Sequence, residues 1–367
     1  MKSGFTTGSC AAAASKAAAY MLLSGEEKLN IDIMTPKGVN FHADILEISI
    51  EKDRVSCAVK KYSGDDPDIT NGTLIFSEVS FCKESGEVII DGGKGVGRVT
   101  KPGLDQPVGN AAINSVPRKM ITDALKEVMD AFDYEGGLKV KIYIPEGEEL
   151  AKKTFNPKLG IVGGLSVIGT SGVVEPMSEK ALTHTIFIEL RQKRALGQTL
   201  ALVTPGNYGR DFMSKEYGFT EDMSVKCSDF VGDTLDMIKE LGFEKLLFVG
   251  HIGKLSKVAL GVMNTHSKYG DGRMEAILSC TENLKEEEKA EILNVATTEE
   301  AVNILDRYGI RDMVMNSLLE KINLNITNRL GAECKAETVM YSRQHGLLAE
   351  TAGAKDAIEQ LKRLQEG

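Results

Sequence analysis

The sequence predicts a protein of two domains, in which an N-terminal α+β domain with a mixed sheet precedes a C-terminal doubly wound α/β domain. The chain has 367 residues, a length that favours two domains, each large enough to bury its own core. Strand patterns predominate in the first half, whereas strands and helices alternate in the second half, as they do in parallel sheets. We place the boundary at Gly197 and expect domains of residues 1–196 and 197–367.

The first half opens with an alanine-rich stretch, "GFTTGSCAAAASKAAAY", which predicts a helix over residues 9–23 that stops before Gly25. Alternating apolar residues predict strands in "NIDIMTP", "FHADILEISIEKDRVSCAVKKYS" and "GEVIIDGG". A second helix begins in "SVPRKM", where Ser115 is the expected N-cap and Pro117 lies in the first turn, and it stops before Gly136. We also expect a strand in "LKVKIYIP", a glycine-broken strand in "GIVGGLSVIGTSG" and a helix in "SEKALTHTIFIELRQKRA".

The second half alternates between the two periodicities. Strands are predicted in "TLALVTPGNYG", "EKLLFVGHIGK" and "AETVMYS", and the first two run into glycine loops. Helices are predicted in "FVGDTLDMIKELG", in "SKVALGVMNTH", over residues 286–308 and 311–324, and from Asp356 onward. Because such sheets bind ligands at the carboxyl ends of their strands, we expect the loops of residues 204–210 and 250–254 to bind a ligand.

Composition and charge exclude several classes of protein. The formal net charge of −9 argues against general binding of nucleic acid or of anionic membranes. No stretch is long and apolar enough to span a bilayer, and the pattern of a signal peptide is missing at the N-terminus. The six cysteines form no CxxC pair, which indicates reduced thiols. We therefore expect a cytoplasmic protein with neither a nucleic-acid nor a membrane partner.

Two loops of the first half could be mistaken for known binding motifs. The glycine loop "GGKGVGR" is followed by "VTKPGL" and not by a helix, so we expect its glycines to let the backbone approach a ligand or another loop, not to bind a dinucleotide. The acidic loop "GDDPDITNG" has the carboxylates of a magnesium site but equally the residues of an ordinary turn, and it lacks the calcium-loop pattern. We expect no metal there and keep the loop as a candidate substrate contact.

The histidines give no metal pattern either. His251 and His266 are fifteen residues apart and no third ligand has a suitable spacing, which argues against zinc. His251 follows a strand of the second half, so it is either a base or hydrogen-bond donor in the ligand site or a histidine that is merely hydrogen-bonded. The nucleophile motifs GxSxG and SxxK and the P-loop are all missing. The residues alone therefore leave the chemistry open.

Eight stretches, taken together and in order, resemble the CbiD family, the cobalt-precorrin-5B C(1)-methyltransferases of anaerobic cobalamin biosynthesis. They lie within residues 4–275 and read "GFTTGSCAAAASKAA", "KKYSGDDPDITNG", "GGKGVGRVTKPGL", "AAINSVPRKMI", "LGIVGGLSVIGTSGVVEPMS", "VTPGNYG", "VGHIGKLSKVALGVMNTHS" and "DGRME". One departure is "KKYSGDDPD", where the family pattern is "KKDAGDDPD". The departure removes an acid next to the loop and further weakens the case for a metal.

The resemblance implies a methyltransferase that uses S-adenosylmethionine to methylate carbon 1 of cobalt-precorrin-5B, giving cobalt-precorrin-6A. Cobalt enters only as part of this substrate. A methyl transfer of this kind is a direct displacement that positioning and the exclusion of water can accelerate, which agrees with the missing nucleophile motifs.

On this reading the second domain binds the methyl donor and the first binds the tetrapyrrole. The expected donor-binding residues follow two strands, with His251 also the candidate catalytic residue: Gly206, Asn207, Tyr208, Gly250 and His251. The expected substrate contacts include hydroxyls and cations suited to a polycarboxylate: Thr6, Thr7, Ser9, Lys101, Arg118, Thr170 and Ser171. Asp65 and Asp66 of the acidic loop and His266 are further candidate substrate contacts.

The start of the alanine-rich helix has two interpretations. The free N–H groups and hydroxyls of residues 6–9 would suit a substrate carboxylate at the positive end of the helix. The alternative is a tightly packed helix with an ordinary threonine cap.

Two other functions remain open alongside methyl transfer. One is a nucleotide-dependent transferase that uses the glycine loops for phosphates, and the other is a non-catalytic tetrapyrrole carrier. A homo-oligomer, and transient contacts with other enzymes of the cobalamin pathway, are candidate partners.

Overall fold

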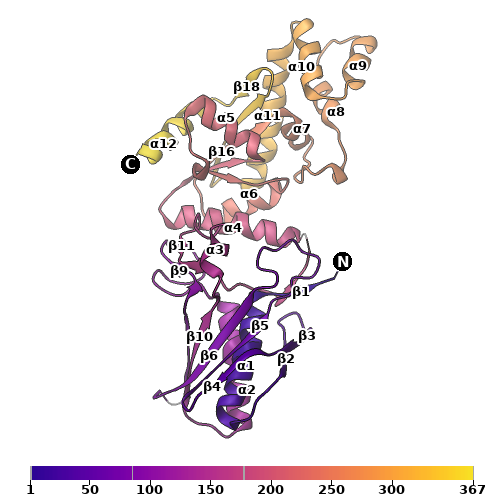
Figure 1. The fold of residues 1–367 in the computed structure, drawn as a ribbon. Helices are drawn as coiled ribbons and strands as arrows, with labels where there is room; N and C mark the ends of the chain where they lie inside the picture. Colours follow the sequence, from indigo (N-terminus) through magenta and orange to yellow (C-terminus); the bar gives the residue numbers. More distant parts are fainter. Residues whose placement is uncertain (1, 85, 177, 367) are drawn as a thin grey trace. The chain divides into compact units, whose positions relative to one another are not determined.

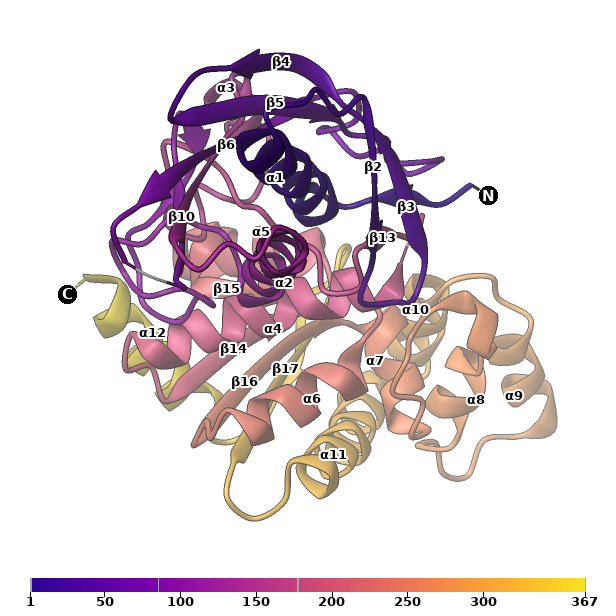
Figure 2. The ribbon, with the colours of Figure 1, turned by 90° about the horizontal axis from the view of Figure 1, so that it is seen from below.

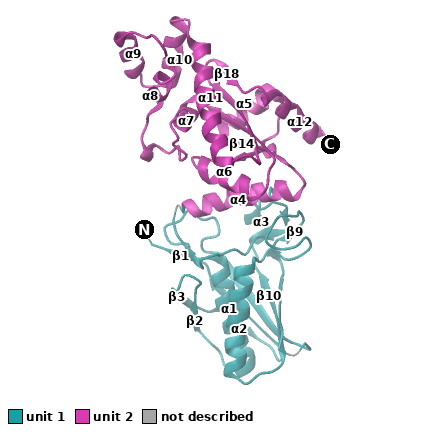
Figure 3. Ribbon diagram, turned by 180° about the vertical axis from the view of Figure 1, so that it is seen from behind, with its two compact units in different colours: residues 1–178 teal, residues 179–367 magenta. Residues whose placement is uncertain are grey.

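The computed structural model describes residues 2–84, 86–176 and 178–366 (Figure 1). The chain divides into two compact units, residues 1–178 and 179–367 (Figure 3). The boundary thus precedes helix α4 (Glu179–Ala195) and does not lie at Gly197, where we predicted it. The reason is that Ile186 and Leu190 of α4 are buried in the core of the second unit.

The first unit is built on a five-stranded sheet of mixed orientation, which confirms the predicted α+β class. Its order is β4-β5-β6-β10-β7, with the last pair parallel and the others antiparallel. The strands are β4 (Leu46–Ile50), β5 (Arg54–Lys60), β6 (Leu74–Cys82), β7 (Val88–Gly92) and β10 (Gly137–Tyr143). A separate hairpin pairs β2 (Asn30–Met34) with β3 (Asn40–Asp44).

Helix α1 (Thr7–Ser24) lies at the centre of the first unit. Figure 2 shows it nearly end-on, between the sheet, the β2–β3 hairpin and helix α2 (Ser115–Ala131). Its alanines are at most 1% exposed, from Ala11 to Ala14 and from Ala17 to Ala19. Small side chains on every side therefore let the sheet, the hairpin and α2 all approach the α1 backbone.

Short strand pairs hold the loops of the first unit against one another. They comprise β1 (Gly4–Phe5) with β13 (Val173–Val174), β9 (Arg98–Val99) with β11 (Ile161–Val162), and β8 (Gly95–Val96) with β12 (Gly164–Leu165), and helix α3 (Gly147–Ala151) lies beside the last of these. A Cβ on Gly95 would lie 1.8 Å from the carbonyl oxygen of Ile144, and one on Gly164 would lie 2.2 Å from the backbone of Gly95. The glycines of "GGKGVGR" thus serve close approach to another loop.

The second unit contains a second five-stranded sheet, in the order β15-β14-β16-β17-β18, which confirms the predicted doubly wound fold. The strands are β14 (Leu200–Thr204), β15 (Ser224–Lys226), β16 (Lys245–His251), β17 (Lys335–Ser342) and β18 (Gly346–Glu350). All pairs are parallel except β17 with β18. The chain leaves β14 for β15 on one side and then returns to β16 on the other, so the strand order reverses between β14 and β16.

Helices cover both faces of this sheet. One face packs against α5 (Asn207–Tyr217) and α12 (Ala354–Glu366), through residues such as Leu202 and Val249. The other packs against α4, α6 (Val231–Glu240), α7 (Ile252–Ala259) and α11 (Arg311–Leu330), with α8 (Arg273–Leu278), α9 (Glu286–Leu293) and α10 (Thr298–Arg307) beyond. Side chains that alternate along β14 and β16 supply both cores, as expected of strands buried on both faces.

Several predicted elements differ in extent from the observed ones. The region predicted as one helix over residues 286–308 is two helices, because Thr297 caps α10 in a capping box with Glu300. Helix α7 begins at Ile252 and not in "SKVAL". Helix α5, which begins inside the predicted glycine loop, was not expected from the sequence.

Candidate functional site

The carboxyl ends of β14, β16 and β17 bring together several polar residues of the second unit. We call this region the carboxyl edge and define it as residues 204–210, 250–254 and 342–343. Val203 pairs with Phe248, and His251 pairs with Tyr341, so the three strand ends are neighbours. The predicted donor-binding residues Gly206, Asn207, Tyr208, Gly250 and His251 all lie here.

His251 is held by both of its ring nitrogens. The N–H of Gly253 donates to Nδ1 at 3.0 Å, so that Nδ1 carries no proton. The proton is therefore on Nε2, which donates to Oε1 of Glu299 at 3.1 Å. In this arrangement His251 caps α7, and its role as a base stays a prediction, since either nitrogen must first lose its partner.

Glu299 lies at the start of α10 and accepts hydrogen bonds from three residues. Besides His251, they are the hydroxyl of Ser342 at 2.7 Å and the N–H of Arg343 at 3.0 Å. Burial raises the pKa of Glu299, but these hydrogen bonds outweigh burial and lower the pKa below its ordinary value. The sequence pattern of α10 gave no sign that this glutamate belongs to the carboxyl edge.

Two lysines connect the loops of the carboxyl edge. The Nζ of Lys254 donates to the carbonyl of Pro205 at 3.2 Å and pairs with Asp229 at 3.0 Å. The Nζ of Lys226 donates to the side-chain oxygen of Asn207 at 3.1 Å. Burial alone would raise the pKa of Asp229. Lys254 and the hydroxyl of Thr265 outweigh this effect and lower the pKa below its ordinary value, so this carboxylate stays ionised.

The outer part of the edge is open. Tyr208 is 59% exposed, and the guanidinium of Arg343 lies 4.8 Å from the centre of its ring. Gly206 is extended at φ −172°, and a Cβ there would meet nothing within 4 Å. A ligand can therefore reach the backbone of this loop.

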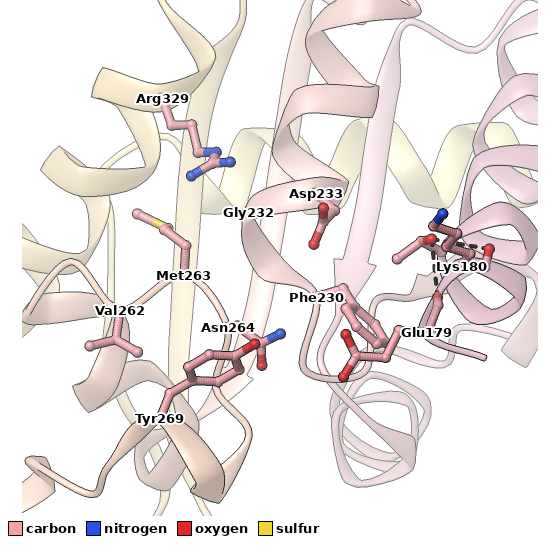
Figure 4. A pocket seen from close by; sticks show the side chains of 11 residues that line it. Glu179, Lys180, Phe230, Gly232, Asp233, Val262, Met263, Asn264, Tyr269 and Arg329 are labelled. Atoms are coloured by element: carbon pink, nitrogen blue, oxygen red, sulfur yellow. Dashed lines mark hydrogen bonds between the residues drawn. The ribbon is translucent and has the colours of Figure 1, made fainter. Parts of the chain in front are cut away.

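Two hollows lie elsewhere in the second unit. The larger, of about 700 Å³, is lined by the start of α4, by Phe230, Met263, Tyr269 and Arg329 among others, and Figure 4 shows the α4 residues across from Met263 and Arg329. The smaller, of about 300 Å³, is bordered by Lys257, Thr265 and Arg273 among others. Both are bordered by the segment of residues 262–273, yet His266 borders neither; it is exposed, and its Nδ1 accepts the N–H of Lys268 at 3.1 Å.

Most of the donors that we predicted to be free at the start of α1 are engaged. The N–H of Gly8 donates to the carbonyl of Ile168 at 3.0 Å, and the N–H of Ser9 donates to the hydroxyl of Thr6 at 3.2 Å. The hydroxyl of Ser9 donates to the carbonyl of Gly172 at 2.6 Å, and Thr7 and Ser9 are both buried. The loop of residues 168–172 thus occupies the helix start, which favours the packed, capped interpretation.

The acidic loop is tied to the core by a buried lysine. Lys61 is 2% exposed, donates to the hydroxyl of Ser63 at 2.7 Å and forms an ion pair with Asp68. Asp65 is exposed and accepts the backbone N–H of Lys2 at 2.6 Å, and Asp66 is half-buried. Within the ranges that the structure describes, no group of three His, Cys, Asp or Glu residues could hold a metal ion.

The remaining predicted substrate contacts differ in how available they are. Arg118 donates to the carbonyls of Ile113 at 2.8 Å and Ile90 at 3.0 Å, and burial lowers its pKa. Its guanidinium therefore holds loops of the first unit together. Lys101 and Thr170 are exposed, and the hydroxyl of Ser171 donates to the carbonyl of Val173 at 2.9 Å.

No helix among the described residues is long and apolar enough to cross a membrane. The structure also shows where sequence reasoning missed polar residues of the second unit. Lys226, Asp229, Glu299 and Ser342 lie at strand ends or face them and carried no sequence signal. Thr204 and Lys254 lie within the two predicted ligand loops, but neither was named as a site residue.

Comparisons with known proteins relate the whole chain to one family. The CbiD family model matches residues 1–176, and the model of the CbiD C-terminal domain matches residues 264–352. A cobalt-precorrin-5B C(1)-methyltransferase of Ruminiclostridium cellulolyticum is 46% identical, over 98% of this chain and 95% of its own length. The enzyme of the same name from Alkaliphilus metalliredigens is 42% identical, over 99% and 95%.

One solved structure is also similar. It is the crystal structure of a cobalamin biosynthesis protein (cbiD) from Archaeoglobus fulgidus, which is 27% identical and matches over 74% of this chain and 84% of that one, with a TM-score of 0.39.

Proposed function

The chain belongs to the CbiD family, and from this membership we propose that it is a cobalt-precorrin-5B C(1)-methyltransferase of cobalamin biosynthesis that takes its methyl group from S-adenosylmethionine. The observation that carries the proposal is the near-complete match to enzymes of that name, over 98% of the chain at 46% identity. The product is cobalt-precorrin-6A, and cobalt is present only as part of the substrate. The enzyme acts in the cytoplasm, and an oligomer or contacts with other enzymes of the pathway stay predictions.

For a direct methyl transfer, the main task of the protein is to position the methyl donor and the substrate. The donor supplies an electrophilic methyl group on a sulfonium. The chain orients the two reactants and excludes water, for which no nucleophilic side chain is needed. The thiols agree with this: burial raises the pKa of Cys10, Cys57 and Cys227 to about 12, so that none of the three is a ready nucleophile.

We place the methyl donor at the carboxyl edge, against Gly206, Asn207, Tyr208, Gly250 and His251. Support comes from the reversal of strand order between β14 and β16, the point at which open α/β sheets bind ligands. The exposed ring of Tyr208 offers an apolar face, and Gly206 lets a ligand reach the backbone. His251 holds the start of α7 in place beside this site.

The substrate contacts stay a proposal, and the geometry ranks them. The exposed side chains of Lys101 and Thr170 can reach a polycarboxylate macrocycle. Asp65, Asp66, His266, Thr6 and Ser171 are less accessible or already accept or donate a hydrogen bond. Arg118, Thr7 and Ser9 act through packing, because their polar groups are buried or bonded within the unit.

The test is turnover by the full-length protein. We expect purified protein supplied with cobalt-precorrin-5B and S-adenosylmethionine to release S-adenosylhomocysteine and to add one methyl group to the macrocycle, as seen by mass spectrometry. Binding of the macrocycle without any S-adenosylhomocysteine would instead identify a carrier. Thermal stabilisation by ATP but not by S-adenosylmethionine would identify a nucleotide-dependent transferase.

A further inference from the structure

The N-terminus of helix α5 presents unoccupied backbone donors at the carboxyl edge. The helix has eleven residues, and its N-cap Gly206 has no side chain to satisfy them. Among the described residues, the N–H groups of Asn207 and Tyr208 have no hydrogen-bond acceptor. The first N–H groups of a helix carry partial positive charge and bind anions.

A buried hydroxyl directly beneath this turn also has no partner. Thr204 is 0% exposed, and no group of the described chain accepts from or donates to its Oγ1. Its side chain lies under the first turn of α5, since a Cβ on Gly209 would be 2.8 Å from the Cβ and 3.1 Å from the Cγ2 of Thr204. A buried hydroxyl without a partner costs about 1–3 kcal/mol, so it needs an explanation.

Other buried threonines of the second unit do have partners. The hydroxyl of Thr234 donates to the carbonyl of Phe230 at 2.7 Å, and that of Thr338 donates to Asn323 at 2.9 Å. Among the residues that the structure describes, two further buried polar atoms lack partners, Ser256 Oγ in α7 and His345 Nε2 in the β17–β18 hairpin. Of these three residues, only Thr204 packs under a helix start with open donors.

Positive charge surrounds the same turn. Lys226 holds the side chain of Asn207 at 3.1 Å, and Lys254 holds the carbonyl of Pro205 at 3.2 Å. The carboxylate of Asp229 pairs with Lys254 at 3.0 Å and accepts the hydroxyl of Thr265 at 2.9 Å. The charge of the ligand that suits this turn is therefore negative.

From these observations we propose that the first turn of α5, with the hydroxyl of Thr204, binds a carboxylate. This rests on the proposed function, which brings two sources of carboxylate: the amino-acid end of the methyl donor and the acetate or propionate groups of the macrocycle. Because the turn lies beside Tyr208 and Gly206, where we place the methyl donor, we assign the carboxylate to the amino-acid end of that methyl donor. The carboxylate accepts the N–H groups of Asn207 and Tyr208 and the hydroxyl proton of Thr204.

The test compares two ligands that differ in the amino-acid end, by calorimetry on the full-length protein. S-Adenosylhomocysteine carries the carboxylate, whereas 5′-methylthioadenosine lacks it. We expect Thr204→Val to weaken the binding of S-adenosylhomocysteine about tenfold, because a hydrogen bond to a charged group is lost. The affinity for 5′-methylthioadenosine should not change. Thr204→Ser keeps the hydroxyl and should bind both ligands as the parent protein does.

The melting temperature distinguishes a role of Thr204 in ligand binding from a role in packing the core. Valine has the shape of threonine and removes an unpartnered hydroxyl, so the melting temperature of ligand-free Thr204→Val should not fall. The matched control is Thr234→Val, which removes a bonded hydroxyl of a buried threonine and should lower the melting temperature without changing either affinity. A fall in stability for Thr204→Val with unchanged affinities would overturn the proposal.

Other outcomes also decide the matter. An equal loss of affinity for both ligands in Thr204→Val would overturn a carboxylate site, because Thr204 would then contact the adenosine part that the two ligands share. Weaker binding of the macrocycle with unchanged S-adenosylhomocysteine would keep the site but assign it to the substrate.

A parent protein that binds no S-adenosylhomocysteine would contradict the proposed function and leave the site to be tested with acetate alone. In ¹⁵N-tyrosine-labelled protein, the NMR signal of the Tyr208 amide is identified by its loss in Tyr208→Phe. A change in the chemical shift of this signal on addition of acetate, smaller in Thr204→Val, would support the site. The absence of any shift would overturn it.

Discussion

At the scale of the residue, the structure changes what His251 can do. Its position after a strand made it a candidate base, yet Gly253 and Glu299 occupy both ring nitrogens and fix a neutral ring with the proton on Nε2. Glu299 in turn is held by Ser342 and Arg343. The chain of contacts therefore joins α10, the end of β17 and the start of α7.

Glu299 gives a prediction about pH. Its pKa in the folded protein is lowered from 4.5, so its contribution to stability is fully present above the unfolded pKa and is lost as the pH falls through the folded pKa. We expect Glu299→Gln to lower the free energy of unfolding by about 2 kcal/mol at pH 7, from the loss of charge-assisted hydrogen bonds. The difference from the parent protein should narrow below about pH 4.5.

Urea denaturation across pH 3.5–8, a range chosen to cover roughly the ordinary pKa of a carboxyl group, measures this difference. The control is Glu287→Gln, an exposed glutamate of α9, which should leave stability nearly unchanged. A gap between Glu299→Gln and the parent protein that stays constant down to the lowest pH would contradict the ionised role of Glu299.

At the scale of the element, α1 is explained by packing on all of its sides. The sheet, the hairpin and α2 surround it, and the hydroxyl of Ser15 bonds that of Ser77 in β6 at 2.8 Å. Alanine has the highest helix propensity and the smallest side chain that keeps a helix firm. The stretch that looked featureless in the sequence is the centre of the first core.

The packing of α1 predicts a strong size limit. Ala14 is 0% exposed, so Ala14→Leu must displace neighbours on a well-packed surface and should cost about 1–3 kcal/mol or more. Differential scanning calorimetry should show a clear fall in melting temperature. Ala131→Leu, at the exposed end of α2, makes the same change without neighbours and should be neutral; equal effects of the two would contradict close packing around α1.

Helix α5 shows why local patterns miss some elements. The stretch "TPGNYG" has the proline, asparagine and glycines of a turn, and it was interpreted as a loop. Yet Gly209 lies inside the first turn of α5, where any side chain would collide with Thr204. The glycine serves a contact between helix and strand, and such a contact has no signature in the local sequence.

At the scale of the whole molecule, the thiols are protected by burial. Cys10, Cys57, Cys227, Cys280 and Cys334 are buried, whereas Cys82 is partly exposed at the end of β6. Burial raises the pKa of Cys334 to about 11 and that of Cys82 above its ordinary value. A buried thiol is slow to form the reactive thiolate.

We therefore expect one thiol to react with Ellman's reagent in the native protein and six after denaturation in guanidinium. The single reactive thiol should be absent from Cys82→Ser, with the melting temperature little changed. Labelling of several thiols at similar rates before unfolding would show that the cores open more readily than the structure implies.

The sequence by itself determined the two fold classes, most of the strands and helices, and the two strand ends at which a ligand is expected, because apolar periodicity and turn residues are local properties. It could not place the boundary, since the burial of Ile186 and Leu190 depends on strands that follow them in the chain. Nor could it tell which helix start is free.

Only the tertiary structure decided that last point. At the start of α1, the loop of residues 168–172 accepts the N–H groups of Thr6 and Gly8 and the hydroxyl of Ser9, whose acceptor Gly172 is 163 positions away in the sequence. The N–H groups of Asn207 and Tyr208 at the start of α5, and the hydroxyl of Thr204 beneath them, have no such partner among the described residues. Whether a polar group is satisfied depends on what folds back onto it, and that is set by contacts between segments far apart in the chain.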